Sequence, residues 1–296
     1  MANLLDIRRR IKSVKNTQQI TKAMKMVSAA KLKRAQTRVV NARPFAEKMR
    51  EVLGKLAEQT TEDFHHPLLD NRGDQRYLVV LVTADKGLCG AFNTNLQKAG
   101  QTFLKEHAGK HIELLAIGRK GRDFFRRRHA TLAGEYVGLT GKGRVEFSEA
   151  LEVARDVIKR FTEDDSLDKV FLIFSEFKSV LTQRVAVEQI LPISQETKAE
   201  GAPTDLSQPV TLKEYIYEQP PAEIFSRLLP RLIETQIFRA LLESIASEQG
   251  ARMTAMEAAS KNAGELISSL TLNMNRVRQA AITREIIEIV SGAAAL

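Results

Sequence analysis

The chain has 296 residues, of which 43% are apolar and 27% are charged. This composition is typical of a soluble folded protein and excludes wholesale disorder and a collagen-like repeat. No window approaches 18 consecutive apolar residues, and the first residues lack the apolar core of a signal peptide, so we expect neither a membrane span nor export. The single cysteine, Cys89, excludes an intrachain disulfide and argues against a thiolate zinc site.

The net charge of +9 is concentrated in the first fifth of the chain. Residues 1–57 hold 15 Lys and Arg against 3 Asp and Glu, whereas residues 58–207 and 208–296 carry net charges of −2 and −1. A nucleic-acid-binding domain usually carries its basic residues over a whole face. A single basic segment instead indicates a partner with an acidic surface, although a polyanion explains the charge as well.

The first 57 residues predict one long helix. Its apolar residues are spaced by three and four positions, which is the heptad rhythm of a coiled coil. This seam consists of Leu4, Ile7, Ile11 and Val14, a polar stretch at Thr17, Gln18 and Thr21, then Met24 and Val27, and later Phe45, Met49, Val52 and Leu56. Since the average globular helix has about 11–12 residues, a compact domain of its own cannot cover this one.

Residues 77–195 predict a different architecture, in which buried strands alternate with amphipathic helices. Continuous apolar runs, typical of parallel strands buried on both faces, occur at 77–85, 112–118, 169–177 and 185–193. Helical patterns lie between them near 94–107, 121–128 and 147–161. This alternation predicts a small, mostly parallel, Rossmann-like α/β domain. The polar segment that follows, 198–210, contains two prolines and predicts a linker or an exposed loop.

Residues 211–291 predict a second long helix with the most regular heptad pattern of the chain. Steps of three and four residues join Met253, Met256, Ser260, Ala263, Ile267, Leu270, Met274, Val277 and Ala281. The pattern fails beyond Ala281, and Pro230 predicts a bend near the start of the helix. Neither long helix can bury its stripe alone, so we expect them to pair as an antiparallel coiled coil, with the α/β domain at one end or side.

Three short segments carry residues with chemical potential, and we favour a structural explanation for each. The glycine-rich turn at 83–95 follows a strand and precedes a helix, as phosphate-binding turns do, but it lacks the dinucleotide and Walker spacings. His65 and His66 have no second cluster that would complete a metal site. The basic segment 119–129 suits nucleic acid but is more typical of a solvated helix end. We therefore expect no catalytic residue, no metal and no cofactor.

Three segments together resemble the gamma subunit of the bacterial F-type ATP synthase. They are IRRRIKSVKNTQQITKAMKMVSAAKLKRAQ near the N-terminus, TADKGLCGAFN in the middle and ASEQGARMTAMEAASKNAGELISSLTLNMNRVRQAAITREIIEIVSGAAAL at the C-terminus. The resemblance covers essentially the whole chain. It implies a non-catalytic rotor of the central stalk, whose paired terminal helices lie inside a ring of three alpha and three beta subunits, with the catalytic residues on the beta subunits.

The resemblance also implies partners and contact residues. The partners are the alpha and beta subunits, the epsilon subunit and the membrane ring of c subunits, with the chain peripheral to the cytoplasmic face of the cell (inner) membrane and proton flow driving rotation. Matching motifs place contacts with the catalytic subunits at Met24, Lys25, Arg278, Gln279 and Thr283. Contacts near the membrane ring fall on Tyr215, Tyr217 and Glu218. Light-regulated plant relatives carry an inserted cysteine pair, which this chain lacks, so thiol switching of that kind is not expected.

Two other functions stay open at this point. A nucleotide-binding enzyme built on the α/β domain predicts saturable nucleotide binding by the isolated chain. A coiled-coil nucleic-acid-binding protein predicts tight, salt-dependent DNA binding that survives deletion of residues 77–195.

Overall fold

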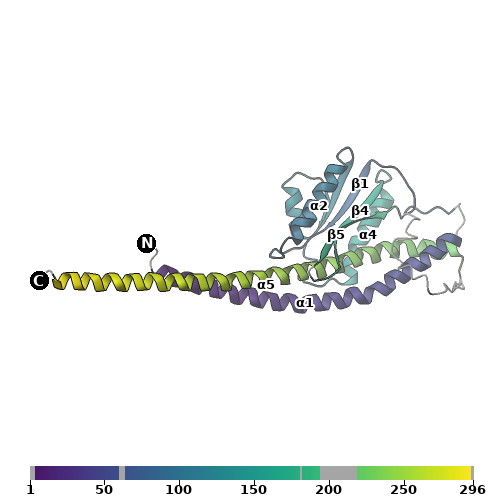
Figure 1. The fold of residues 1–296 in the computed structure, drawn as a ribbon. Coiled ribbons are helices and arrows are strands. Elements are labelled where there is room, and N and C mark those ends of the chain that lie inside the picture. Colours follow the sequence, from purple (N-terminus) through teal and green to yellow (C-terminus); the bar gives the residue numbers. More distant parts are fainter. Residues whose placement is uncertain (1–3, 60–63, 181, 194–218, 295–296) are drawn as a thin grey trace, which may run out of the picture. The chain divides into compact units, whose positions relative to one another are not determined.

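The structure, a computed structural model, describes residues 4–59, 64–180, 182–193 and 219–294. The chain divides into two compact units. The first, which we call the coiled-coil unit, is Met1–Ala30 with Arg252–Leu296, and the second, the α/β unit, is Lys31–Ala251. Two long helices, α1 (Leu4–Gln59) and α5 (Pro221–Ala294), each contribute to both units (Figure 1). Both helices continue through an internal proline, Pro44 in α1 and Pro230 in α5.

The α/β unit is built on one five-stranded sheet with the order β3-β2-β1-β4-β5. The strands are β1 (Arg76–Val82), β2 (His111–Ile117), β3 (Leu132–Tyr136), β4 (Lys169–Phe177) and β5 (Gln183–Leu191). All neighbours pair in parallel except β4 and β5, which are antiparallel. The four predicted strands are confirmed, but the sequence analysis missed β3. Its five residues, LAGEY, are half-buried or exposed, so they give no continuous apolar run.

Three helices connect the strands: α2 (Phe92–Glu106), α3 (Arg119–Arg126) and α4 (Phe147–Glu163). Right-handed crossovers place α2 and α3 on one face of the sheet, because the chain advances from β1 through β2 to β3. The return from β3 to β4 places α4 on the other face. A capping box formed by Glu146 and Glu149 begins α4. Of its apolar residues, Val157 and Phe161 are fully buried, whereas Phe147 is 42% exposed.

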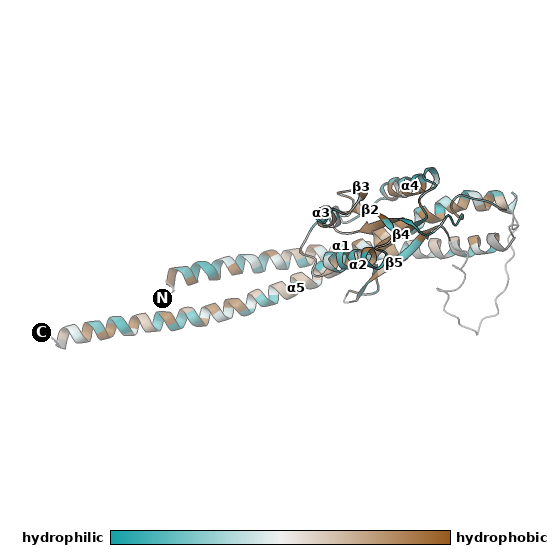
Figure 2. Cartoon of the chain, turned by 90° about the horizontal axis from the view of Figure 1, so that it is seen from above, coloured by the Kyte–Doolittle hydropathy of each residue, from teal (hydrophilic) through white to brown (hydrophobic). Residues whose placement is uncertain are grey.

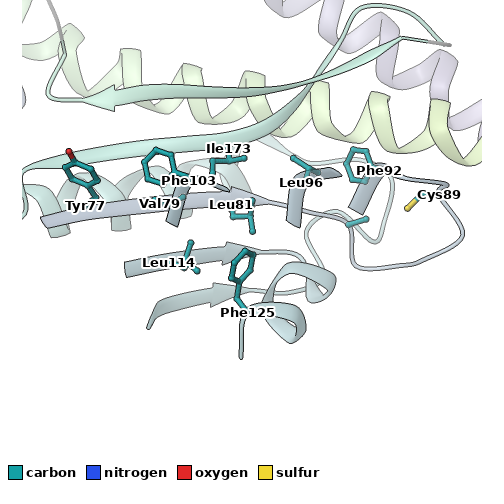
Figure 3. Close-up of a cluster of buried hydrophobic side chains, with 11 residues drawn as sticks. Tyr77, Val79, Leu81, Cys89, Phe92, Leu96, Phe103, Leu114, Phe125 and Ile173 are labelled. Carbon is teal, nitrogen blue, oxygen red and sulfur yellow. The ribbon is translucent and has the colours of Figure 1, made fainter. Parts of the chain in front are cut away.

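The core of the α/β unit is almost completely buried. Residues 79–82 of the central strand β1 have no solvent exposure, as expected of a strand covered on both faces. Figure 3 shows side chains from β1, β2, β4, α2 and α3 pointing toward one another. Gly100 in α2 admits the ring of Phe125, because a Cβ at that glycine would lie only 2.9 Å from the ring.

The α/β unit also includes residues 31–59 of α1 and 221–251 of α5. One face of α5, including Ile233, Ile237 and Leu241, is completely buried. Two hydrogen bonds join this helix to β4: the Ser175 N–H donates to Ser244 Oγ at 3.2 Å, and Ser247 Oγ donates to the Ser175 carbonyl at 3.1 Å. These segments of the long helices are therefore integral to the packing of the α/β unit.

The coiled-coil unit is an antiparallel helix pair, as the sequence predicts. Residues of rising number in α1 face residues of falling number in α5, with Thr21 opposite Ser260 and Lys25 opposite Glu257. Every predicted seam position of α5 from 253 to 281 is buried or half-buried. Figure 2 shows that polar and apolar residues alternate along this part of both helices.

The seam of α1 differs from the prediction at three positions, Thr17, Val27 and Phe45, which are exposed. Val27 is 55% exposed, and the neighbouring Ser28 is buried in its place. The heptad pattern selected the apolar residue, but the buried position is occupied by a serine. Further along α1, Phe45 is likewise exposed, whereas Leu56 is buried as predicted.

Candidate functional site

The coiled-coil unit is the candidate functional site because it combines a polar interface with a large unpartnered apolar surface. The interface is polar where the apolar seam of α1 is interrupted, at Thr17–Thr21. Thr21 Oγ1 and Ser260 Oγ share a hydrogen bond of 2.7 Å, and Gln18 Nε2 donates to the Ser260 carbonyl at 3.3 Å. Gly264 leaves space for the Gln18 amide, since a Cβ there would lie 3.1 Å from its nitrogen. This polar layer joins the two helices closely without a large apolar contact.

One ion pair flanks the polar layer. Lys25 Nζ lies 2.5 Å from Glu257 Oε1, and the two side chains are 37% and 61% exposed. Lys25 therefore pairs within its own chain rather than presenting a free cation, which the sequence did not indicate. Met24, the other predicted contact residue of this segment, is half-buried.

The end of α5 carries apolar residues that no part of the described chain covers. All side chains from Ile282 to Ala293 are exposed. The large apolar ones are Ile282, Ile286, Ile287, Ile289 and Val290, at 49–71% exposure. The reason is geometric: continuing the register of the pair places the start of α1, Leu4, opposite about Val277, so α5 extends past its mate (Figure 1). Exposed apolar surface of this extent is typical of a binding site for another chain.

The predicted polar contact residues lie next to this apolar end. Arg278, Gln279 and Thr283 are all exposed, as the heptad phase predicts. The Thr283 hydroxyl donates to the Gln279 carbonyl at 3.0 Å, so its hydrogen is already engaged and its oxygen remains an acceptor. The other predicted contact residues, Tyr215, Tyr217 and Glu218, lie outside the described residues.

The glycine-rich turn follows β1 at the carboxyl edge of the sheet, and it carries an exposed leucine that the sequence did not predict. Leu88 has a φ of 61° and is 65% exposed, an unusual conformation for a leucine. Lys86 and Lys120 are exposed beside it, a Cβ at Gly87 would lie 3.8 Å from Cε of Lys120, and neither lysine forms an ion pair within the described part of the chain. A leucine inside KGLCG was the only signal in the sequence. The turn therefore offers an apolar tip with a basic rim.

The same turn is held internally, as the structural explanation predicts. The Ala84 N–H donates to Asn93 Oδ1 at 3.0 Å, and the Asn93 amide donates to the Lys86 carbonyl and to Cys89 Sγ. Cys89 itself is buried. Asp85 lies near the start of this turn, just past the end of β1, and its side chain accepts four hydrogen bonds.

The remaining chemically suggestive segments are engaged in ordinary contacts. Arg122 and Arg126 both pair with Glu135, and the Arg128 guanidinium stacks 3.8 Å from the centre of the Phe124 ring. His66 Nδ1 accepts a hydrogen bond from the Leu68 N–H, and burial lowers the pKa of His66. Within the described ranges, no three His, Cys, Asp or Glu side chains gather in a way that would hold a metal ion. In the same ranges no helix is both long and apolar enough to cross a membrane.

Comparisons with known proteins agree on one family. A family model described as ATP synthase matches residues 3–296. The ATP synthase gamma chain of Solibacter usitatus is 51% identical, with 100% of this chain and 99% of that protein covered, and the one of Trichlorobacter lovleyi is 48% identical, with 99% and 98% covered.

Solved structures extend the likeness to the fold. The central stalk and c-ring structure of the Tetrahymena thermophila mitochondrial ATP synthase has a chain with a TM-score of 0.60 and 26% identity, covering 81% of this chain and 99% of its own length. A chain of the Euglena gracilis mitochondrial ATP synthase in rotational state 3 has a TM-score of 0.65 at 18% identity, covering 99% and 94%, and supports the fold alone. Sequence, helix pair and sheet together show that the chain belongs to the family of ATP synthase gamma chains.

Proposed function

We propose that the chain is the rotor of the central stalk, which transmits torque between an ion-driven ring of c subunits and a catalytic ring of three alpha and three beta subunits. The observation that carries this proposal is the unpartnered end of α5, where Ile282–Ala293 is exposed. An apolar helix end needs an enclosing partner, and a ring of subunits encloses a single helix on all sides. The chain thereby takes part in ATP synthesis coupled to proton transport.

An asymmetric helix pair suits this role. Three chemically equal catalytic subunits can be driven into different states only if the rotor presents a different face to each. The coiled-coil unit has such faces: an apolar one with Ile20 and Val27 exposed, and a charged one with Lys25 and Glu257. The basic charge of residues 1–57 complements acidic surfaces on a partner.

The proposed partners are the alpha, beta and epsilon subunits and the c ring, with the chain peripheral to the cytoplasmic face of the membrane. We assign catalysis to the beta subunits and no catalytic residue to this chain. The turn after β1 supports that assignment, because Asp85 fills the position in which a nucleotide phosphate would bind. We propose Tyr215, Tyr217 and Glu218 as the contact with the c ring.

Copurification tests the assignment of class. A tagged copy of the full chain, isolated from native membranes in mild detergent, is expected to elute with alpha and beta subunits at about three of each per copy. An untagged strain processed in parallel is the control. Elution of the chain without either subunit would contradict the proposal.

The polar residues beside the α5 end are proposed to contact a loop of one catalytic subunit at a time. A charged hydrogen bond lost at such a contact costs about 1.5–3 kcal/mol. We therefore expect Arg278→Ala and Gln279→Ala each to slow ATP hydrolysis several-fold in a complex that still assembles. Arg284→Ala is the matched control, since Arg284 is also exposed but lies about 120–140° around the helix from Arg278 and Gln279. Wild-type hydrolysis rates in both test variants would remove these residues from the mechanism.

A second contact is proposed at Met24 and Lys25. Because Glu257 already pairs with Lys25, a lysine introduced at position 24 has no acidic partner in its own chain. We expect this lysine to form an ion pair with an acidic residue of a catalytic subunit and so to stabilise one rotary state by about 1–3 kcal/mol. Met24→Lys is expected to lower the number of protons pumped per ATP before it lowers hydrolysis. Met26→Lys, at a position 61% exposed on a different side of α1, serves as the control. Unchanged pumping per ATP in Met24→Lys membranes would refute the contact.

A further inference from the structure

The carboxylate of Asp85, three residues past the end of β1, is coordinated like a bound anion. Oδ1 accepts hydrogen bonds from the backbone N–H groups of Arg119 and Gly138, both at 3.0 Å. Oδ2 accepts from the Gly141 N–H at 2.7 Å and from Thr140 Oγ1 at 2.9 Å. The residue is 9% exposed. Each oxygen thus has two donors, and the carboxylate is fully satisfied without solvent.

In other open α/β sheets, a bound ligand occupies the position that this carboxylate takes here. In open α/β sheets, anionic ligands bind at the carboxyl ends of the strands and near helix N-termini. Here the N–H of Arg119, the first residue of α3, points to Asp85 instead. Gly141 permits the close approach, because a Cβ at that position would lie 3.1 Å from Oδ2. Burial acts to raise the pKa of Asp85, but the four hydrogen bonds outweigh it and lower the pKa.

The loop that supplies three of the four donors, residues 138–145, continues to α1 within the α/β unit. Gly143 has a φ of 73°, and a Cβ there would lie 3.1 Å from Cδ of Lys31. Arg38 Nη1 donates to the carbonyl of Val145 at 3.4 Å, and Val145 is itself buried. Continuous contacts therefore lead from β1 through the carboxylate and the loop to helix α1.

We propose that Asp85 is an internal anion that fixes loop 138–145 to the sheet and thereby holds α1 to the sheet, so that the two turn together. Asp85 is a positioning residue in this scheme, acting through the loop. The attachment of α1 to the sheet through this loop depends only on this chain and needs no partner. Its consequence for coupling rests on the proposed rotor function.

Two substitutions of Asp85 distinguish a role of its negative charge from a role of its volume alone. Asp85→Ala leaves four donors unpaired around a space that formate or acetate fits. Asp85→Asn fills the space but turns an NH2 group toward two of the donors. In the assembled complex, hydrogen exchange of the amides of Arg119, Gly138 and Gly141 reports directly on the bonds to the carboxylate. Asp165→Ala, at a side chain 93% exposed, is the matched control.

We expect exchange in residues 138–145 and 31–39 to become at least tenfold faster in both Asp85 variants and to stay unchanged in Asp165→Ala. Formate or acetate, but not chloride at equal ionic strength, is expected to restore slow exchange in Asp85→Ala and not in Asp85→Asn. Protons pumped per ATP are expected to fall in Asp85→Ala and recover with formate. Arg38→Ala, which leaves the carboxylate untouched, is expected to loosen 31–39 alone and covers the case in which Asp85→Ala does not assemble.

Three results would overturn the proposal. Absence of rescue by either small carboxylate would remove the internal anion. Faster exchange in the loop with unchanged exchange in 31–39 would show that the loop does not hold α1. Normal pumping per ATP despite a loosened α1 would remove the role in coupling. Failure of the wild-type complex to pump at all would instead count against the rotor function, so the two failures are distinguishable.

Discussion

The α/β unit and the coiled-coil unit bury their residues in opposite ways. In the α/β unit, strand β1 has four consecutive residues with no solvent exposure, and the rings of Phe103 and Phe125 fill the space above it. In the coiled-coil unit, most seam positions are only half-buried, and a hydrogen-bonded layer at Thr21 and Ser260 replaces an apolar one. The first unit is stabilised by its own core. The second leaves an apolar surface uncovered within the described residues, as the proposed enclosure by a ring of subunits requires.

The largest effect that tests this contrast is truncation of matched aliphatic side chains. Leu81→Ala in β1 removes a fully buried side chain, and such cavities cost about 2–5 kcal/mol. Ile267→Ala removes a half-buried seam residue, for which about 1 kcal/mol is expected. Native-state hydrogen exchange in the assembled complex measures both opening free energies. Equal losses at the two positions would show that the coiled-coil unit is packed as tightly as the sheet.

A smaller effect at alkaline pH is expected in the α/β unit. Burial first, and then Asp156, which accepts a hydrogen bond from the phenol, raise the pKa of Tyr136 to about 12. Since the folded pKa lies above the unfolded value, the stabilisation is complete below pH of about 10 and is lost as the pH rises toward 12. The full linkage is about 1.4 kcal/mol per pH unit, and solvent screening of the half-exposed phenol lowers it.

Thermal denaturation between pH 9 and 12 measures this loss, with Tyr136→Phe as the reference. The variant is expected to lose less stability with rising pH than the wild type. Parallel curves for the two chains would mean that the phenol ionises equally easily in the folded and unfolded states.

In the coiled-coil unit, the hydrogen bond between Thr21 and Ser260 is expected to contribute a coupling free energy of about 1 kcal/mol in a double-mutant cycle. Thr21→Val alone leaves the Ser260 hydroxyl without its 2.7 Å partner and is expected to destabilise the helix pair. Thr21→Val combined with Ser260→Ala removes both hydroxyls and is expected to recover most of that loss. Additive effects in the double-mutant cycle, read from hydrogen exchange of residues 14–28, would show that the hydroxyls do not interact.

The smallest expected effect is that of the exposed ion pair. Lys25→Ala is predicted to change the stability of the helix pair by less than about 0.5 kcal/mol, because the Lys25 and Glu257 side chains are 37% and 61% exposed and water screens the pair. The same exchange experiment in low and high salt checks this. A loss of several kcal/mol would mean that the pair, and not packing, holds the helices together.

The sequence predicted those elements whose signal is local and repeated. Strand β1 follows from a continuous apolar run, and the α5 seam from nine heptad positions, since each neighbour confirms the period. Strand β3 was missed because its residues are half-buried at the sheet edge, and Val27 was misplaced because a heptad pattern cannot distinguish it from Ser28. Both depend on how much space the neighbouring elements leave.

The Asp85 cradle was not predictable from the sequence for a different reason. Three of its four donors are backbone N–H groups, which every residue except proline possesses, so no residue type marks them. They come from Arg119, Gly138 and Gly141, far from Asp85 in the chain. Only the sheet topology brings them together. The exposed Leu88 was missed likewise, because its positive φ is a property of the folded turn.

Rotation of the chain inside a fixed catalytic ring tests the central claim most directly. Lys105, exposed on α2, offers a site for a probe as Lys105→Cys, while the native Cys89 is buried and reacts slowly. With the alpha and beta subunits attached to a surface, added ATP is expected to turn a bead on that cysteine in one direction, with three pauses per revolution. ATP hydrolysis at the normal rate with a stationary bead would contradict the account.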